Sequence, residues 1–518
     1  MNINLMQQES RVKKSLLNAR VNLIFYFITL ALSFFSRKIF LDSLGADFVG
    51  LTVTLQNLLG FLNLAELGIG LAIGYVLYKP LYEQDYLKLN EIISVFGYLY
   101  RWVGKIILVA GCILSAFLPL IFAESSFDYC VIYSAFYAFL TSSLIGYFIN
   151  YRQTLLSADQ RNYVVAAYFQ TANLCKILIQ MLSAYYTGSY YLWIVIELTF
   201  GILYSIILNW KINQVYPWLK SDVRSGRELH RKYPEVIRYT KQLFVHKIGT
   251  LFQHQMTPIL VYSLESLETV AFYGNYTMIT RNLESLLNNF LGSTSAGIGS
   301  LIAEGNKAKI QRVYWELTAL RFFISGVVIY ALYKLLPPFI TLWLGEEYML
   351  SNTVLYCVLG MSFLSINRGA TDQFINGHGL FYDTWAPLAE SAIYLITALV
   401  CGHIWGLEGV LMGNILSTFL IIYCWKPYFL FAKGFKIPII NYWFNWTKHL
   451  TLMIVALYLV HLCTQNILYI SNGTQNWQHW IVSGVIIVVL TSIILYITLY
   501  MTSGMRNLTK RLTSKLSR

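Results

Sequence analysis

Of the 518 residues, 57% are hydrophobic and 12% are charged, and the mean hydropathy is +0.54. An ordinary soluble protein has about 25% charged residues, so this composition excludes that class. Because each bilayer span takes roughly 20 apolar residues, the chain has room for about a dozen or more spans if its loops are short. This leaves no sizeable soluble domain and predicts a polytopic membrane protein.

Apolar runs separated by charged or Gly-, Pro- and Asn-rich segments predict an all-α fold with about fourteen transmembrane helices. The first residues are polar and basic, and the run that follows has no A-x-A-like cleavage site, so we expect an uncleaved first span. The predicted spans are Asn18–Leu41, Phe48–Leu77, Tyr100–Phe122, Tyr129–Tyr151, Val164–Thr187, Tyr191–Ile212, Lys241–Ser263, Thr269–Leu291, Tyr314–Leu336, Val354–Asn376, Thr384–Cys401, Leu407–Leu430, Trp443–Cys463 and Trp480–Tyr500.

Lysine and arginine predict the orientation, because positively charged loops stay cytoplasmic. They occur near the N-terminus and in every second loop except the one around His378, whereas the alternate loops carry acids such as Asp42, Glu124, Glu265 and Glu346. Both termini are therefore expected in the cytoplasm. The net charge of +13 reflects this asymmetry and an attraction to anionic membrane lipids. Nucleic acid is not an expected partner, because the basic residues are scattered over short loops.

An internal repeat is visible. Leu41–Leu44, with Phe48 and Gly50 after it, recurs as Leu264–Leu267, with Phe272 and Gly274 after it. In the second copy the gap before the phenylalanine is one residue longer. Six predicted spans separate the copies, so the two halves have the same membrane orientation, as in many transporters. We therefore predict an N-lobe of six spans at residues 1–215, a basic cytoplasmic linker at 216–240, a C-lobe at 241–435, and two further spans with a basic cytoplasmic tail at 436–518.

Several predicted spans carry polar residues three, four or seven positions apart, which places them on one helix face. Such a face must meet protein or water rather than lipid. One interpretation is hydrogen bonding between helices, and the other is a polar cavity. The residues chosen as the polar face of a cavity are Asn22, Gln56, Asn63, Gln242 and His246.

Four cations, Lys176, Arg281, Arg321 and Arg368, fall inside predicted spans, where a charge needs a reason. With Arg37 they are candidates for a cationic substrate-binding cavity. The competing interpretation is local pairing, of Arg281 with a carboxylate three residues on and of Arg368 with one four residues on. Arg321 and Arg37 also lie nearer span ends, where long side chains extend to the membrane surface.

The acids Glu66, Glu284 and Asp372 are candidates for proton or sodium coupling, or are simply the partners of those cations. Glu197 and Glu390 belong to the same group of intramembrane acids. No metal site or cofactor is expected, because the histidines are dispersed and the seven cysteines form no CxxC pair. The aromatic residues are expected chiefly in belts at the membrane surfaces.

No enzymatic function is predicted. The sequence has neither a GxxxxGK[ST] nor a GxSxG motif, which excludes an ATP-driven motor and an α/β-hydrolase nucleophile. The largest predicted exterior loops, Pro337–Asn352 and Gln465–His479, are too short for a catalytic domain. No credible set of catalytic residues remains.

The stretch from Arg37 to Leu51, with Leu44-Gly45 and Phe48-x-Gly50 inside it, and Ala65–Gly70 after it, resembles the beginning of Wzx-type bacterial polysaccharide flippases. This family makes O-antigen, capsule or exopolysaccharide precursors available for assembly and belongs to the MOP superfamily, with lipid II flippases and MATE drug exporters. Trp343–Tyr348 and Gly406–Val410 resemble the same family farther along, so the likeness extends over almost the whole chain.

The resemblance implies two six-helix lobes around a central cavity, two further helices and alternating access. The implied cargo is an oligosaccharide on undecaprenyl diphosphate, moved from the cytoplasmic to the periplasmic leaflet of the inner membrane, with other proteins of the polysaccharide pathway as potential partners. Family members bind the anionic head with basic cavity residues. Arg37 is the cation that best matches the motif, whereas the other four come from the polar pattern alone.

Three alternatives remain at this point. A MATE-type drug or cation antiporter would need an acidic cavity, and a flippase for lipid II or a teichoic-acid precursor could use the same basic one. A membrane polymerase, glycosyltransferase or acyltransferase of envelope synthesis is disfavoured by the short loops and the repeat.

Overall fold

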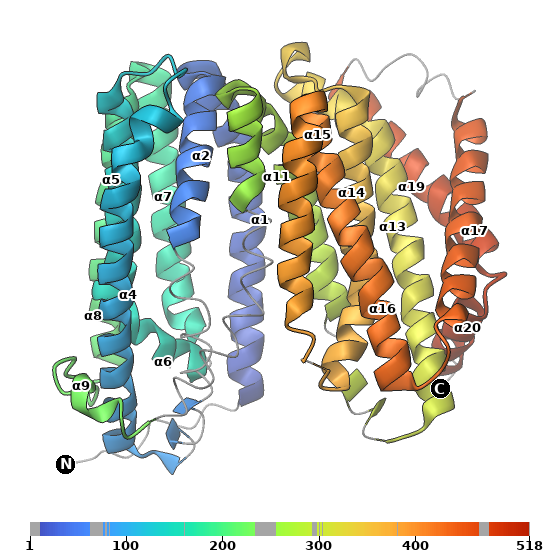
Figure 1. Cartoon of the computed structure of the whole chain (residues 1–518), viewed down its shortest axis with the longest axis horizontal. Coiled ribbons are helices and arrows are strands. Elements are labelled where there is room, and N and C mark those ends of the chain that lie inside the picture. The colour runs from blue at the N-terminus through green and yellow to red at the C-terminus, as the bar shows by residue number, and fades with distance from the viewer. Residues whose placement is uncertain are drawn as a thin grey trace. The chain divides into compact units, whose positions relative to one another are not determined.

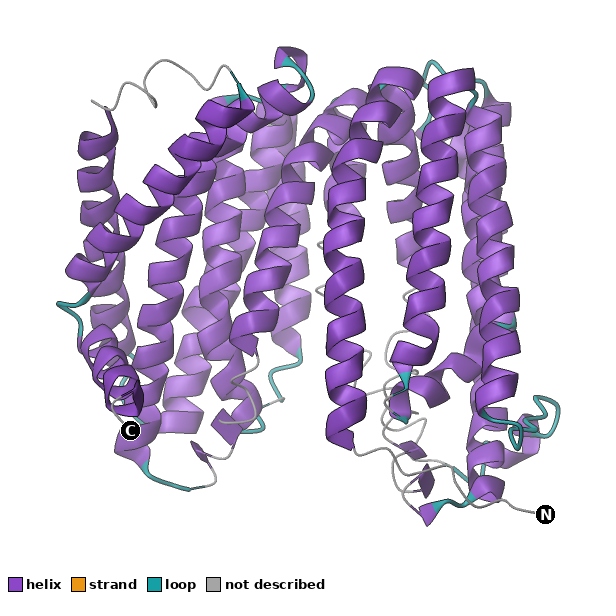
Figure 2. Ribbon diagram, turned by 180° about the vertical axis from the view of Figure 1, so that it is seen from behind, coloured by secondary structure: helices purple, strands orange, loops and turns teal. Residues whose placement is uncertain are grey.

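The computed structural model describes residues 11–62, 76–77, 80–81, 83–159, 161–233, 255–292, 298–299, 301–302, 304–380, 382–465 and 476–516. These residues form helices and loops and no strand (Figure 2), which confirms the predicted all-α class. In each of two compact units, Met1–Ala271 and Phe272–Arg518, the long helices lie side by side (Figure 1).

The first unit contains α1, α2 and α4 to α9, together with the helical residues 255–264 and the beginning of α11. The packing boundary between the units thus falls after the linker that the sequence predicts at residues 216–240. The bounds are α1 Arg11–Leu44, α2 Ala46–Leu62, α4 Tyr86–Ile121, α5 Tyr129–Phe148, η2 Asn150–Arg152, α6 Gln153–Ala158, α7 Asn162–Thr187, α8 Tyr190–Val215 and α9 Gly226–Leu229.

The second unit contains most of α11 and every later element. Two of its short elements, η4 and η5, are π-helical, and η3 is a 3₁₀ turn. The bounds are α11 Leu267–Gly292, α13 Lys307–Trp343, η3 Glu346–Tyr348, α14 Asn352–Gly377, α15 Trp385–Thr418, η4 Phe419–Trp425, α16 Lys426–Phe429, η5 Leu430–Phe435, α17 Ile440–Gln465, α19 Trp477–Leu499 and α20 Ser503–Leu516.

Eight helical segments in the described part of the chain are long and apolar enough to cross a membrane. One of them, Trp385–Phe435, has 51 residues and contains both the eleventh and the twelfth predicted spans. The remaining predicted spans correspond to α2, α7, α11, α14 and the helical residues 255–264, of which the second and seventh spans lie only partly within the described residues. The chain is a multi-pass membrane protein.

Helix α4 begins fourteen residues before the predicted Tyr100, at Tyr86. The charged residues Lys88 and Glu91 interrupt the apolar run, so hydropathy alone places the start too late. The Asp85 side chain accepts a hydrogen bond from the backbone N–H of Lys88 and caps the helix. Helix α4 therefore extends beyond the apolar run that marks the span.

Helix α13 is also longer than predicted, because it continues through Pro337 and Pro338 to Trp343. Proline removes a backbone donor and normally ends or kinks a helix in water. Inside a membrane protein, neighbouring helices can satisfy the carbonyl groups that are left free. At the other end the Asn306 side chain caps the helix by accepting a hydrogen bond from the N–H of Lys309. Between these two ends α13 has 37 residues.

The eleventh and twelfth predicted spans form a helical hairpin within the segment Trp385–Phe435, which contains α15, η4, α16 and η5. Its turn is a kink at Trp405 and Gly406, and Gly406 has a φ of 56°, in the left-handed region that glycine adopts without strain. Beyond the kink, a Cβ at Gly413 would lie 2.7 Å from the backbone N of Ala398, so the two arms touch at their backbones.

The open end of this hairpin is closed by an ion pair. Lys426 Nζ lies 2.6 Å from Asp383 Oδ2, and the Asp383 side chain is only 2% exposed. Asp383 precedes the first arm and Lys426 lies in the second arm, far from the Gly406 turn, so the two arms are joined both near the turn and far from it.

In the first unit, two glycines let α2 approach its neighbour closely. A Cβ at Gly50 would lie 1.9 Å from the carbonyl oxygen of Leu267, and one at Gly60 would lie 2.4 Å from the Gln255 side chain. Contacts of this closeness require a residue without a side chain. Since position 50 meets 267 and position 60 meets 255, the helical residues 255–264 run antiparallel to α2.

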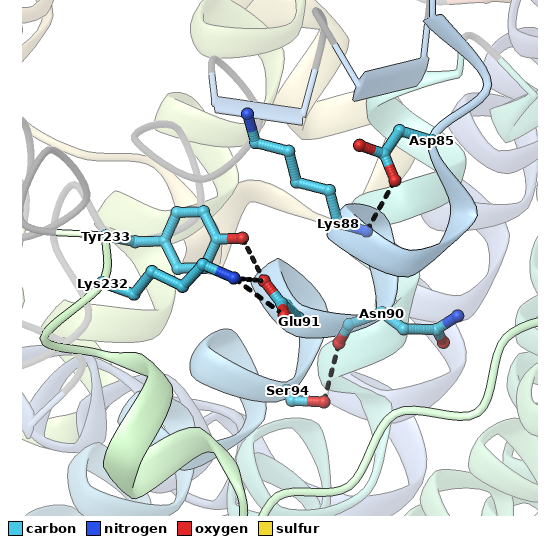
Figure 3. A network of polar contacts seen from close by, with 7 residues as sticks. All are labelled: Asp85, Lys88, Asn90, Glu91, Ser94, Lys232 and Tyr233. Carbon is cyan, nitrogen blue, oxygen red and sulfur yellow. Dashed lines mark hydrogen bonds and ion pairs between the residues drawn. The ribbon is translucent and has the colours of Figure 1, made fainter.

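The described part of the predicted linker packs on the start of α4 rather than extending from it (Figure 3). Lys232 Nζ lies 2.7 Å from Glu91 Oε2, and the Tyr233 hydroxyl donates to the same carboxylate. Burial and the neighbouring Glu91 carboxylate raise the pKa of Tyr233. The Asn90 side chain accepts a hydrogen bond from the N–H of Lys220 at 2.6 Å, so residues of the linker belong to the first unit.

The predicted basic tail begins with the helix α20, which the apolar runs do not indicate because it is amphipathic. Its Gly504 lies against α13, where a Cβ would come within 2.3 Å of the Trp315 carbonyl oxygen. Arg511 Nη1 of α20 forms a 2.9 Å ion pair with Glu316, whose side chain is 3% exposed.

We expect Gly50→Ala to destabilise the protein by about 1–3 kcal/mol, because the new methyl group overlaps the Leu267 backbone, which cannot rotate away as a side chain can. The measurement is the midpoint of thermal unfolding in detergent. Gly146→Ala is the matched control, because no atom lies within 4 Å of a Cβ at this position in α5. Equal unfolding midpoints for the two variants would contradict the close contact.

Candidate functional site

Three helices are long enough to span a membrane but too polar to meet the hydropathy of a lipid-facing span. They are α7, α11 and α14, each with 26 residues. Polar faces of this kind have to be covered by protein or water. Three of the five predicted cations lie on these helices, Lys176 on α7 of the first unit and Arg281 and Arg368 on α11 and α14 of the second.

In the first unit, Lys176 of α7 is paired with Glu197 of α8. Lys176 Nζ lies 2.9 Å from Glu197 Oε1, and Gln180 Nε2 donates to Glu197 Oε2 at 3.0 Å. The two charged side chains are 21% and 17% exposed. The Glu197 carboxylate therefore has partners on both oxygens, and the Lys176 charge is neutralised within the unit.

Arg37 lies on α1, seven residues before the end of that helix, and its Nη2 donates to the carbonyl oxygen of Ala271 at 2.8 Å. Gln56 of α2 is exposed. Glu66, together with the polar-face residues Asn63, Gln242 and His246 and the side chain of Asn22, lies outside the described residues.

In the second unit, Arg321 is buried at 3% exposure instead of extending to a membrane surface. Its Nη1 donates to the carbonyl oxygen of Ile366 on α14 at 2.6 Å. The guanidinium lies against Gly369, where a Cβ would come within 2.4 Å of Nη1. A residue with a side chain at position 369 would therefore displace the arginine.

Arg368 pairs with Asp372 one turn along α14, as the four-residue spacing predicts. Arg368 Nε lies 2.8 Å from Asp372 Oδ2, and the two side chains are 36% and 33% exposed. Asp372 also acts electrostatically on Arg321, and Glu390 of α15 acts on Arg368. The structure therefore brings two of the predicted cations and one predicted acid together at the contact of α13 and α14.

Arg281 and Glu284, on α11, do not form the ion pair that their spacing allows. The Glu284 carboxylate accepts a hydrogen bond from the Ser362 hydroxyl at 2.6 Å and another from Ser365, both on α14. Arg281 is exposed and has no ion pair among the residues that the structure describes.

Two residues of the α13–α14 cluster were not predicted. The Tyr423 hydroxyl donates to the carbonyl oxygen of Leu364 at 2.6 Å, and Asn367 Nδ2 donates to Ser325 Oγ at 2.8 Å. Asn367 lies on α14 and Tyr423 lies on η4, 56 residues later, so no spacing within one helix links the two residues. In the described part of the chain no group of His, Cys, Asp and Glu could hold a metal ion.

No protein-family model matches the sequence, and no curated protein matches it. Solved structures do. The lipid II flippase MurJ in its inward closed conformation matches with a TM-score of 0.63 and 14% identity, over 92% of this chain and 98% of that chain. A multidrug resistance MATE family transporter of the MOP superfamily, in an inward-facing conformation, matches with a TM-score of 0.54 and 14% identity, over 81% and 99%. At this identity the matches show that the chain has the MurJ- and MATE-like fold.

We expect Lys176→Met and Glu197→Gln to be less destabilising together than Lys176→Met alone. The single change leaves a largely buried carboxylate without its cation, at a cost of about 2 kcal/mol, whereas the double variant removes both charges. Thermal unfolding of the wild type, the two single variants and the double variant gives the coupling between the sites. Simple addition of the two single effects would mean that the pair contributes nothing.

Proposed function

We propose that the chain is a flippase for undecaprenyl-diphosphate-linked oligosaccharide units in surface polysaccharide biosynthesis. It moves them by alternating access from the cytoplasmic to the periplasmic leaflet of the bacterial inner membrane, with both of its termini in the cytoplasm. Support comes from the fold shared with a lipid II flippase over 92% of the chain, together with the resemblance of the Arg37–Leu51 stretch to Wzx proteins. Flipping needs no covalent step, which agrees with the lack of a recognisable catalytic motif.

The proposal of an anionic cargo rests mainly on the charge and the exposure of Arg281. Two serines hold the carboxylate of Glu284, and Arg281 therefore keeps its charge and its exposed donors. A diphosphate in a site of low dielectric constant is held best by charge-assisted hydrogen bonds, and a guanidinium can donate two of them to one phosphate. Arg281 is the first residue to test as a ligand of the lipid head.

Arg368 and Arg321 are the second group of proposed ligands, with Arg37 and Lys176 after them. About a third of the Arg368 side chain is exposed even though it is paired with Asp372. An anion that displaced this carboxylate would meet Arg368 first and the deeper Arg321 behind it. Lys176 is the weakest of these candidates, because Glu197 already neutralises it.

A MATE-type drug or cation antiporter is the alternative that the fold also permits. Such a protein needs carboxylates that a cationic drug can reach. In the described part of the chain, Asp372 and Glu197 are paired with cations and Glu284 is held by serines, which favours an anionic cargo. A lipid II or teichoic-acid precursor has a related anionic head and is the closer alternative.

The test is the appearance of a lipid-linked oligosaccharide on the far side of proteoliposomes, at matched protein level. Arg281→Ala is expected to slow flipping roughly tenfold or more, the loss that follows from removing one charged hydrogen-bonding group. Lys309→Ala is the control, because Lys309 is an exposed cation paired with Glu304 at the start of α13. An unchanged rate for Arg281→Ala would remove this arginine from the path, and export of a cationic dye instead would favour the antiporter.

Coupling to a proton or sodium gradient is proposed for Glu284 and Asp372, with Glu66 as a third candidate. Dissipating the gradient with an ionophore is then expected to stop net accumulation of flipped lipid, and Glu284→Gln is expected to flip at a rate that no longer depends on the gradient. In the Glu284→Gln variant the side-chain amide oxygen can still accept a hydrogen bond from Ser362, so the contact between α11 and α14 is retained. Flipping that continues at full rate without any gradient would show that the protein is not coupled.

A further inference from the structure

Helix α20 is a basic amphipathic helix with no acidic residue in its sequence. Its 14 residues include Arg506, Lys510, Arg511 and Lys515. It follows α19, which has the highest hydropathy of the candidate spans in the described part of the chain (Figure 1). Three residues lie between Leu499 and Ser503, so the two helix ends are at most about 14 Å of extended chain apart and α20 begins at the membrane surface.

One face of α20 is fixed to α13. Met505 and Leu508 are buried, with exposures of 3% and 8%, and Gly504 touches the backbone of Trp315. Arg511 pairs with the buried Glu316 at 2.9 Å. The helix therefore has a fixed orientation and is not a loose tail.

The opposite face carries Arg506 and Lys510, which are exposed and lie four residues apart, on adjacent turns. Neither side chain forms an ion pair with any residue that the structure describes. Two like charges at this spacing repel each other, which a bound anion would relieve. Exposed Tyr500 and Met501 lie between α19 and this face, at the position where a tyrosine and an apolar residue enter the interface of a bilayer.

We propose that the Arg506–Lys510 face of α20 binds the phosphate groups of anionic phospholipids and so anchors the end of the second unit to the membrane surface. The partner is a lipid headgroup, because the cations are adjacent to apolar side chains that only lipid would cover. This surface is separate from the site proposed for the transported lipid and does not depend on the flippase function.

The experiment uses the full chain in detergent, with phosphatidylglycerol or phosphatidylethanolamine added, and measures bound lipids by native mass spectrometry and the unfolding midpoint. The wild type is expected to bind phosphatidylglycerol preferentially. Each surface cation contributes about fivefold to the affinity for an anionic membrane, so Arg506→Gln with Lys510→Gln should weaken the binding roughly 25-fold. Both side chains are exposed, and an unchanged elution profile and helix content would show that the variant is folded.

Two further variants distinguish an effect of this particular face from an effect of the protein's net charge. Arg506→Lys with Lys510→Arg keeps both charges and is expected to retain binding. Arg227→Gln with Arg231→Gln removes two exposed cations at the same spacing from the linker and is expected to have no effect. Equal binding of the two lipids, or equal loss in the Arg227 and Arg231 variant, would overturn the proposal. Stabilisation by inorganic phosphate as large as that by phosphatidylglycerol would also overturn it, in favour of a simple anion site.

Discussion

The interior of a bilayer contains no water, and this constraint determines both the fold and the treatment of its charges. Backbone groups must be satisfied within each span, so the described spans are helices, and α13 remains helical even through Pro337 and Pro338. Side chains with charge must be held in the same way. The cations Lys176 of α7, Arg321 of α13 and Arg368 of α14 accordingly each have a partner within their unit.

Those contacts follow two patterns. Lys176 and Arg368 each meet a carboxylate, whereas Arg321 meets a backbone carbonyl oxygen and the bare surface of a glycine. Only the first pattern removes the net charge locally. A guanidinium held by a carbonyl oxygen keeps its positive charge. Arg321 therefore indicates the sign of the local electrostatic potential better than a simple count of basic and acidic residues does.

The sequence predicts the place of the described spans well, because apolar runs reflect directly what lipid requires. It predicts their ends poorly at α4, where charged residues interrupt the apolar run inside the helix, and at α13, which continues through two prolines. The pair of Arg368 and Asp372 follows from spacing within one helix, and α20 is missed because it is too polar to form an apolar run. The partner of Lys176 lies on the next helix, and the partner of Arg321 is a backbone atom, so neither can be identified without the packing. The lobe limits and the roles of the candidate residues stay predictions.

The hairpin from α15 to η5 also bears on how the protein is made. Its kink at Gly406, its backbone contact at Gly413 and its Asp383–Lys426 pair all join residues within a single stretch of the chain. Contacts between residues close in sequence form early, before distant segments have been synthesised. The two arms can therefore enter the bilayer together during translation, with the charges of Asp383 and Lys426 already neutralising each other when later helices arrive.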